Sequence, residues 1–170
     1  YGKKVAFNFA YELAKEGFVV ISGLARGIDT YAHLGAVKAG GKTIAVLGSG
    51  LKHIYPSENK KLCNEIVKNS GAIITEYEPH TKPLPMNFPS RNRIISGLSN
   101  GVLVVEAKQK SGTLITVDYA LEQGKDVFVI PGNITSINSY RTNELIKQGA
   151  KLVTNTKEII EEIIKWKFMV

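Results

Sequence analysis

The chain has 170 residues and 44% hydrophobic content, which fits one domain with a sizeable core. Its formal net charge of +7 favours polyanionic partners or acidic ligands, although charge says nothing about the fold. One cysteine excludes an internal disulfide, and no apolar run approaches the roughly 18 residues of a membrane span, so we expect no membrane association. With no secretory signal pattern either, the chain is predicted to be cytoplasmic.

The first element predicted is a helix over residues 1–16. Val5, Phe9 and Leu13 recur at four-residue spacing, which places them on one apolar face, and Gly17 ends the helix. Because an α/β unit normally has a strand before its first helix, we expect an N-terminal strand to be missing from this chain.

A strand–turn–helix unit follows and organises the rest of the chain. Residues 18–21 form a continuous apolar run typical of a buried strand, and a helical pattern starts at Asp29. Such a turn points backbone N–H groups and a helix dipole at whatever lies above it, and Arg26 adds a full charge. The turn therefore predicts an anion site, although glycines at these positions also serve only to tighten a turn. Its candidate residues are Ser22, Gly23, Arg26 and Gly27.

The second predicted strand, residues 43–47, ends in the flexible segment Gly48-Ser49-Gly50. Carboxyl ends of parallel strands lie on one edge of a sheet, so we expect this segment to border the same edge as Arg26. His53 follows it without a paired nucleophile or carboxylate, and no metal-ligand spacing occurs in the chain. The pattern thus gives no support for catalysis, a metal or a cofactor.

A third strand over residues 72–75 leads into a proline-rich loop and then into Arg91-Asn92-Arg93, which is predicted to open a helix over residues 94–98. Two arginines and an amide form a dense set of donors suited to phosphates. The alternative is that the arginines form structural ion pairs with Glu76 or Glu106.

The remaining chain continues the alternation of strands and helices. A polar, basic loop after the strand over residues 101–105 supplies Lys108, Lys110, Ser111 and Gly112 as further candidate contacts for an anion. The alternation predicts a doubly wound α/β fold with a mostly parallel sheet in one domain over residues 1–170. The last predicted elements are a helix over 114–121, a strand over 126–130, a short helix over 143–148, a strand over 151–153 and a helix over 157–165.

Five segments carry a family resemblance. They read SGLARGIDTYAH at 22–33, TIAVLGSGLKHIYP at 43–56, FPSRNRIISGLS at 88–99, SGTLITVDYALEQGKDVFVIPGNI at 111–134 and NELIKQGAKLV at 143–153. Together they resemble the DNA-processing protein A family, DprA/Smf, over nearly the whole chain. The resemblance implies an extended Rossmann-like domain without enzymatic activity. It further implies single-stranded DNA binding, RecA loading in natural transformation, and dimerisation.

The resemblance also implies roles for individual residues. Arg26 is similar to the central phosphate-binding arginine of the family, and Lys110 resembles a second basic contact. Arg91 and Arg93 belong to the Arg-Asn-Arg signature and contact phosphate or hold the site together. The segment over residues 143–152 resembles the dimerisation element, with Asn143, Ile146 and Leu152 as its candidate interface residues. The alternative for Ile146 and Leu152 is that they are ordinary core residues.

Two other functions remain open from the sequence. A nucleotide phosphoribohydrolase of the lysine-decarboxylase-like family shares the fold, but Thr116 stands where that family has its acid/base glutamate, and threonine cannot replace a carboxylate at neutral pH. A nucleotide-sensing module would use the same turn to hold one phosphate of a small ligand. A dinucleotide is disfavoured because the Gly-x-Gly-x-x-Gly spacing is absent after the first strand.

Overall fold

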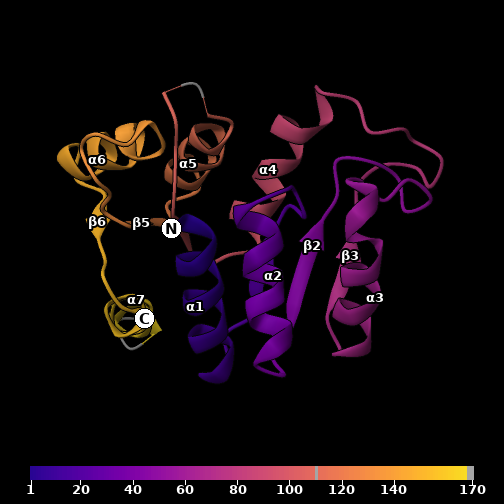
Figure 1. The fold of residues 1–170 in the computed structure, drawn as a ribbon, viewed down its shortest axis with the longest axis horizontal. Helices are drawn as coiled ribbons and strands as arrows, with labels where there is room; N and C mark the ends of the chain where they lie inside the picture. Colours follow the sequence, from indigo (N-terminus) through magenta and orange to yellow (C-terminus); the bar gives the residue numbers. More distant parts are fainter. Residues whose placement is uncertain (110, 168–170) are drawn as a thin grey trace. The chain divides into compact units, whose positions relative to one another are not determined.

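The computed structural model describes residues 1–109 and 111–167. The chain divides into two compact units, Tyr1–Ile95 and Ser96–Val170. Each unit holds a three-stranded parallel sheet, in the orders β1-β2-β3 and β4-β5-β6 (Figure 1). Parallel strands joined through helices confirm the predicted α/β class. The expectation of a single domain over residues 1–170 stays a prediction.

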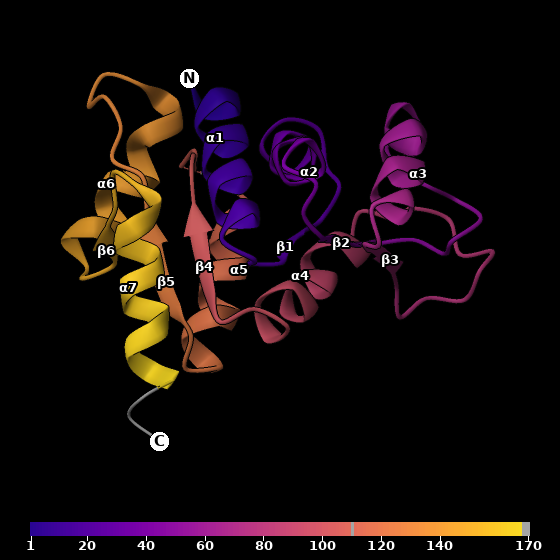
Figure 2. The same ribbon diagram turned by 90° about the horizontal axis from the view of Figure 1, so that it is seen from below.

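The first unit has helices on both sides of its sheet. Figure 2 shows α1, α2 and α3 on one side and α4 on the other. The register pairs Ser22 with Ala45 and Val46 with Ile74, so the three strands end close to one another at the same edge. The bounds are α1 Gly2–Lys15, β1 Val20–Ser22, α2 Ile28–Lys38, β2 Thr43–Val46, α3 Lys60–Lys68, β3 Ala72–Ile74 and α4 Asn87–Gly97.

The core of this unit reaches up to the turn after β1. Leu24, a turn residue, is fully buried in one apolar cluster with Ala45 and Leu47 of the β2 region and Ile66 of α3. Burying a leucine side chain stabilises the folded state by about 1.5–3 kcal/mol. The turn that carries Arg26 is therefore fixed by the core and does not move as a free surface loop.

The second unit repeats the layered plan. Figure 1 shows α5 and α6 on one side of its sheet and α7 on the other. Val104, Val117 and Val129 belong to the core cluster in which α5 packs against β4 and β5. The bounds are β4 Gly101–Val104, α5 Thr113–Glu122, β5 Asp126–Val129, α6 Tyr140–Lys147, β6 Lys151–Leu152 and α7 Thr156–Lys167.

Two predicted helices begin earlier than expected. The short helix expected over residues 143–148 is α6, which begins at Tyr140. The helix expected to open at Arg91 begins at Asn87 instead, so Arg91 and Arg93 lie inside α4. Pro89 is tolerated there because the N–H groups of the first helical turn have no partner within the helix. As a result, residues 91 and 93 lie beyond the first turn of the helix and not in the loop before it. Within the described ranges, no helix has the length and apolar character needed to cross a membrane.

Candidate nucleic-acid interface

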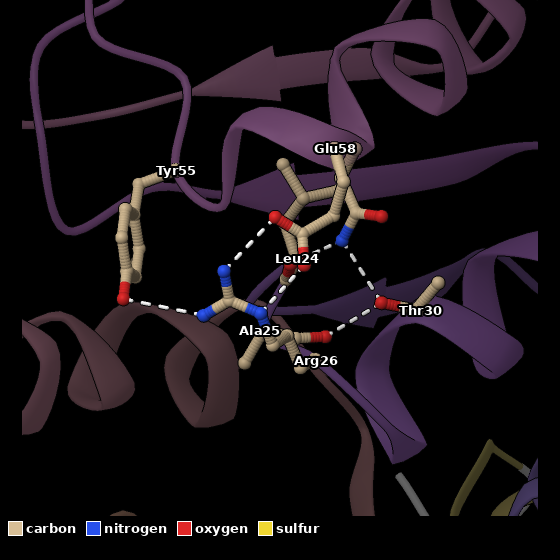
Figure 3. A network of polar contacts seen from close by, with 7 residues as sticks. Leu24, Ala25, Arg26, Thr30, Tyr55 and Glu58 are labelled. Atoms are coloured by element: carbon tan, nitrogen blue, oxygen red, sulfur yellow. Dashed lines mark hydrogen bonds and ion pairs between the residues drawn. The ribbon is translucent and has the colours of Figure 1, made fainter.

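The turn between β1 and α2 is held by a short chain of hydrogen bonds (Figure 3). Leu24 adopts a φ of 63°, a conformation that a leucine rarely takes, and its carbonyl oxygen accepts a hydrogen bond from Asn59 Nδ2 at 2.9 Å. Asn59 Nδ2 also donates to Thr30 Oγ1 at 2.9 Å, and that hydroxyl donates to the Ala25 carbonyl at 2.7 Å. These contacts stabilise the strained conformation immediately before Arg26.

Arg26 extends from this turn into solvent. Its Nε and Nη2 donate to the two carboxylate oxygens of Glu58 at 2.5 and 2.9 Å, and its Nη1 donates to the Tyr55 hydroxyl at 3.3 Å. The guanidinium also lies 5.5 Å from the centre of the Tyr55 ring. The hydrogen bonds to Glu58 and Tyr55 raise the pKa of Arg26, and the hydrogen bond from Arg26 lowers the pKa of Glu58. Both groups are therefore fully charged at neutral pH.

Arg91 supports the same edge from below the surface. Its side chain is buried, and Nη1 donates to the carbonyl oxygens of Gly23 and Val46. Gly23 directly follows β1, and Val46 is the last residue of β2. A Cβ on Gly23 would lie 2.5 Å from Arg91 Nη2 and 2.9 Å from a carboxylate oxygen of Asp29, so a larger residue would require both side chains to shift. Burial lowers the pKa of Arg91. Arg91 thus ties the ends of two neighbouring strands together.

The glycine segment after β2 is enclosed. Ser49 is buried, and a Cβ on Gly48 would lie 2.8 Å from the Phe88 ring. The Gly50 N–H donates to the Thr81 carbonyl at 2.9 Å, so the proline-rich loop closes over this glycine. Gly48, Ser49 and Gly50 lie at the expected edge of the sheet, and their contact with an anion stays a prediction.

An aromatic pair borders Arg26. The centres of the Tyr55 and Phe88 rings lie 5.6 Å apart, and residue Tyr55 is 42% exposed. Farther along α4, Arg93 forms an ion pair with Glu76 through Nη2, which is one of the two pairings that the sequence left open. Asn92 accepts a hydrogen bond from Arg91 Nε at 3.1 Å. The first unit therefore gathers an exposed cation, an exposed ring and a buried arginine at one edge.

The candidate residues of the second unit form its own strand–loop–helix segment. Lys108 is exposed in the loop after β4, while Lys110 lies outside the described residues. At the start of α5, the Ser111 hydroxyl accepts a hydrogen bond from the Thr113 N–H at 3.2 Å, and Gly112 occupies the N-cap position. Arg141 Nε donates to the Gln109 carbonyl at 3.3 Å, which orders the loop beside Lys108.

Comparison with known proteins decides the family. The sequence model of the family described as DNA recombination-mediator protein A matches residues 1–164. The chain belongs to the DNA recombination-mediator protein A family. Relatives of this family are known as DprA or Smf. The DNA processing protein DprA of Bacillus subtilis is 46% identical over 163 residues, covering 96% of this chain and 54% of that protein.

Solved structures of DprA proteins are similar as well. The X-ray structure of DprA from Streptococcus pneumoniae has a TM-score of 0.87 and 47% identity, covering 95% of this chain and 56% of that one. The structure of DNA processing protein A from Helicobacter pylori, a protein with a unique single-stranded DNA binding mode, has a TM-score of 0.85 and 34% identity, covering 97% of this chain and 74% of that one. This chain spans about half the length of the curated relatives it matches.

The predicted dimer residues of this DprA-family chain have different surroundings. Asn143 exchanges two hydrogen bonds with the Gly132 backbone, at 3.2 and 3.0 Å, and so fixes the loop after β5. Ile146 is partly buried against the core of the second unit, whereas Leu152 is 45% exposed. Leu152 is therefore the most accessible apolar group of the three.

Sequence reasoning missed the polar partners of Arg26 and of the turn that carries it. Glu58 lies 32 residues from its partner Arg26, and Asn59 lies 35 residues from the Leu24 carbonyl it binds. His33 is buried, contacts the Thr43 hydroxyl through Nδ1 at 2.7 Å, and has a pKa lowered to about 4, chiefly by burial. No spacing rule connects residues so far apart. In the part of the chain that is described, no group of His, Cys, Asp and Glu could hold a metal ion.

Proposed function

We propose that this chain binds single-stranded DNA through the edge of the first unit that carries Arg26. We further propose that the full-length protein, in the cytoplasm, loads RecA recombinase on the bound strand during DNA uptake. The observation that carries the proposal is the exposed Arg26 guanidinium on a turn fixed by buried contacts. A cation presented by a rigid turn loses little conformational freedom when a phosphate binds.

The ring of Tyr55 favours a single strand over a duplex. Bases of single-stranded DNA are free to stack on aromatic side chains, a contribution of roughly 1–3 kcal/mol per base, whereas paired bases are enclosed in the helix. The ring is exposed and lies beside the guanidinium that would hold the phosphate. The Helicobacter pylori relative binds single-stranded DNA, which supports the proposal of the same ligand for this chain.

Further contacts are proposed for the rest of the interface. In the first unit, the exposed side chain of Arg93 would neutralise a further phosphate, while Ser22 and Gly27 would shape the backbone of the turn. In the second unit, Lys108 and Lys110 would contact phosphates beside Ser111 and Gly112. We propose that Arg91 acts by positioning, because its donors go to the Gly23 and Val46 carbonyls. A homodimer formed through the segment around Leu152 would bring two such interfaces to one strand.

We propose that the chain itself catalyses no reaction. The carboxylate beside Arg26 belongs to Glu58, whose lowered pKa keeps it ionised and unable to act as a general acid at neutral pH. Thr116 occupies the place of the glutamate that phosphoribohydrolases use. Release of free base from nucleoside monophosphates incubated with the chain would contradict this part of the proposal.

The first test is fluorescence anisotropy with a labelled oligothymidine for the wild-type chain and Arg26→Ala, with an unlabelled duplex as competitor. We expect binding that prefers the single strand and that weakens at least tenfold in Arg26→Ala. Lys38→Ala is the matched control, because it removes the same charge from an exposed residue at the opposite end of α2. Equal losses in both variants would indicate a general effect of net charge and would contradict a site at Arg26.

The same assay at several salt concentrations measures how many phosphates are contacted. If about four phosphates are neutralised, the logarithm of the affinity should fall with the logarithm of the salt concentration at a slope of about −3. An affinity that does not change with salt would remove the electrostatic basis of the proposal.

A further inference from the structure

We propose that Glu58 is the specificity-determining residue of the interface: its carboxylate occupies Arg26 until a phosphate of a bound strand displaces it. The site would consequently retain polyanionic strands and reject isolated phosphates such as mononucleotides. The inference rests on the proposed function and adds to it the residue that decides which phosphate compounds are accepted.

The contact between Arg26 and Glu58 has the form that a phosphate would adopt. Two guanidinium donors, Nε and Nη2, point at the two carboxylate oxygens, and the same paired geometry is used by arginine for phosphate. The side chains of Arg26 and Glu58 are 61% and 54% exposed, so a ligand has access to both. Glu58 thus acts as an internal stand-in for the ligand.

The fold builds this competitor into the site. Glu58 lies in the short helical turn Ser57–Asn59, and the next residue, Asn59, donates to the Leu24 carbonyl and to Thr30. The same hydrogen bonds hold the turn that carries Arg26 (Figure 3). Both partners are therefore anchored through one buried amide, and their pairing does not depend on two free side chains meeting by chance.

The energetics favour exchange of the carboxylate for a strand. An exposed ion pair contributes little to the stability of a protein, so losing it costs the folded chain little. An isolated phosphate gains equally little binding free energy, because at the same donors it only replaces the Glu58 carboxylate, which is also an anion. A strand has several phosphates on one backbone, and contacts at other cations raise the effective concentration of the phosphate near Arg26.

Tyr55 keeps Arg26 in place during this exchange. Its hydroxyl accepts a hydrogen bond from Nη1, a donor that Glu58 does not use. Of the five N–H donors of an arginine, Glu58 takes two and Tyr55 one, so two remain when the pair is closed. A phosphate at either remaining donor would lie close to the Glu58 carboxylate and be repelled by it. The charge of Glu58 therefore opposes a phosphate that replaces the carboxylate at its two donors, and it also opposes a phosphate that binds the two remaining donors.

The test compares Glu58→Gln with the wild-type chain in the oligothymidine assay, using unlabelled thymidine monophosphate as a competitor. We expect the variant to bind the oligonucleotide about two- to fivefold tighter, a factor in line with the strength of exposed ion pairs. The monophosphate should compete measurably better against the variant. Thermal unfolding should be unchanged, because glutamine keeps the size of the side chain and the residue is exposed.

Two further variants separate the proposed role from a general effect of charge. Glu16→Gln removes the same charge at an exposed position after α1, at the other end of β1, and should change affinity less than 1.5-fold. In the double variant Arg26→Ala/Glu58→Gln, the gain should vanish, because the donors for which Glu58 competes are absent.

The outcomes distinguish the inference from the function on which it rests. Binding that depends on Arg26 but stays equal or weakens in Glu58→Gln would overturn the inference and leave the proposed function intact. The same gain in the Arg26→Ala background would also overturn it. A folded wild-type chain that fails to bind oligothymidine would count against the proposed function and, with it, the inference.

Discussion

His33 is a buried titratable residue beside the site. Its ring contacts the Thr43 hydroxyl, Asp29 raises its pKa and Arg91 lowers it, and burial brings the net value to about 4 from an ordinary 6.5. The neutral imidazole is therefore the form that the folded chain accommodates. The unfolded chain binds a proton between pH 6.5 and 4 that the folded chain does not, so stability is present above pH 6.5 and is lost as the pH falls.

We predict that the free energy of unfolding falls by about 2 kcal/mol between pH 7 and pH 5 through this residue. Urea unfolding at the two pH values measures the change. In His33→Asn, which cannot titrate, we expect most of this difference to disappear, although the variant is less stable at pH 7. His80→Asn is the control, because His80 is exposed and should leave the pH dependence intact. If His33→Asn showed the same change in the free energy of unfolding as the wild-type chain, groups other than His33 would be responsible for that change.

At the scale of one element, α4 places two arginines in opposite roles. Arg91 is buried and donates to the carbonyls at the ends of two strands, whereas Arg93 is half-exposed and pairs with Glu76. Only Asn92 lies between them in α4, and side chains two positions apart on a helix point to different sides of it. Comparing them tests whether the Arg-Asn-Arg segment supports the site or contacts the ligand.

We predict that Arg91→Met lowers the free energy of unfolding by about 3 kcal/mol, because two buried carbonyls lose their donor and Asp29 loses a nearby positive charge. Arg93→Met should cost less than about 1 kcal/mol, as expected for an exposed ion pair. Chemical denaturation measures both. DNA titrations on Arg93→Met should give a salt slope shallower by about 0.7, the value for one phosphate contact on a single strand. Similar stability losses in both variants would contradict this division of roles.

At the scale of the whole molecule, the proposed dimer depends on an apolar residue that the second unit leaves exposed. Leu152 is 45% exposed at the end of β6, whereas Asn143 and Ile146 already have partners inside the unit. Replacing Leu152 with a charged residue would place an unpaired charge in an apolar contact between two copies.

We predict that Leu152→Asp converts a dimer into a monomer while the chain stays folded. Light scattering after size-exclusion chromatography measures the mass, and circular dichroism checks the fold. Leu121→Asp provides a control with a similarly exposed leucine on α5, 62% accessible, and should remain dimeric. A Leu152→Asp variant that still elutes as a dimer would place the interface elsewhere.

The alternation of apolar runs and amphipathic stretches was sufficient to predict the α/β class, because strand and helix periodicities are local properties of the chain. It also located the turn with Arg26, since the carboxyl ends of parallel strands lie on one edge of a sheet and the segment after the strand over residues 18–21 must start there. The helix containing Arg91 was placed too late, because the proline-rich loop before Asn87 obscured its start.

Only the tertiary structure showed what each arginine contacts. Arg26 and Arg91 both looked like phosphate ligands in the sequence, yet one is exposed beside Glu58 and the other is buried under Gly23. Burial and pairing depend on groups 32 and 68 residues away, which approach through the packing of α3 and α4 regions against the strand ends. Local periodicity contains no information on such distances. The sequence therefore determined the elements and the candidate turn, and the fold decided which arginine is exposed and which is buried.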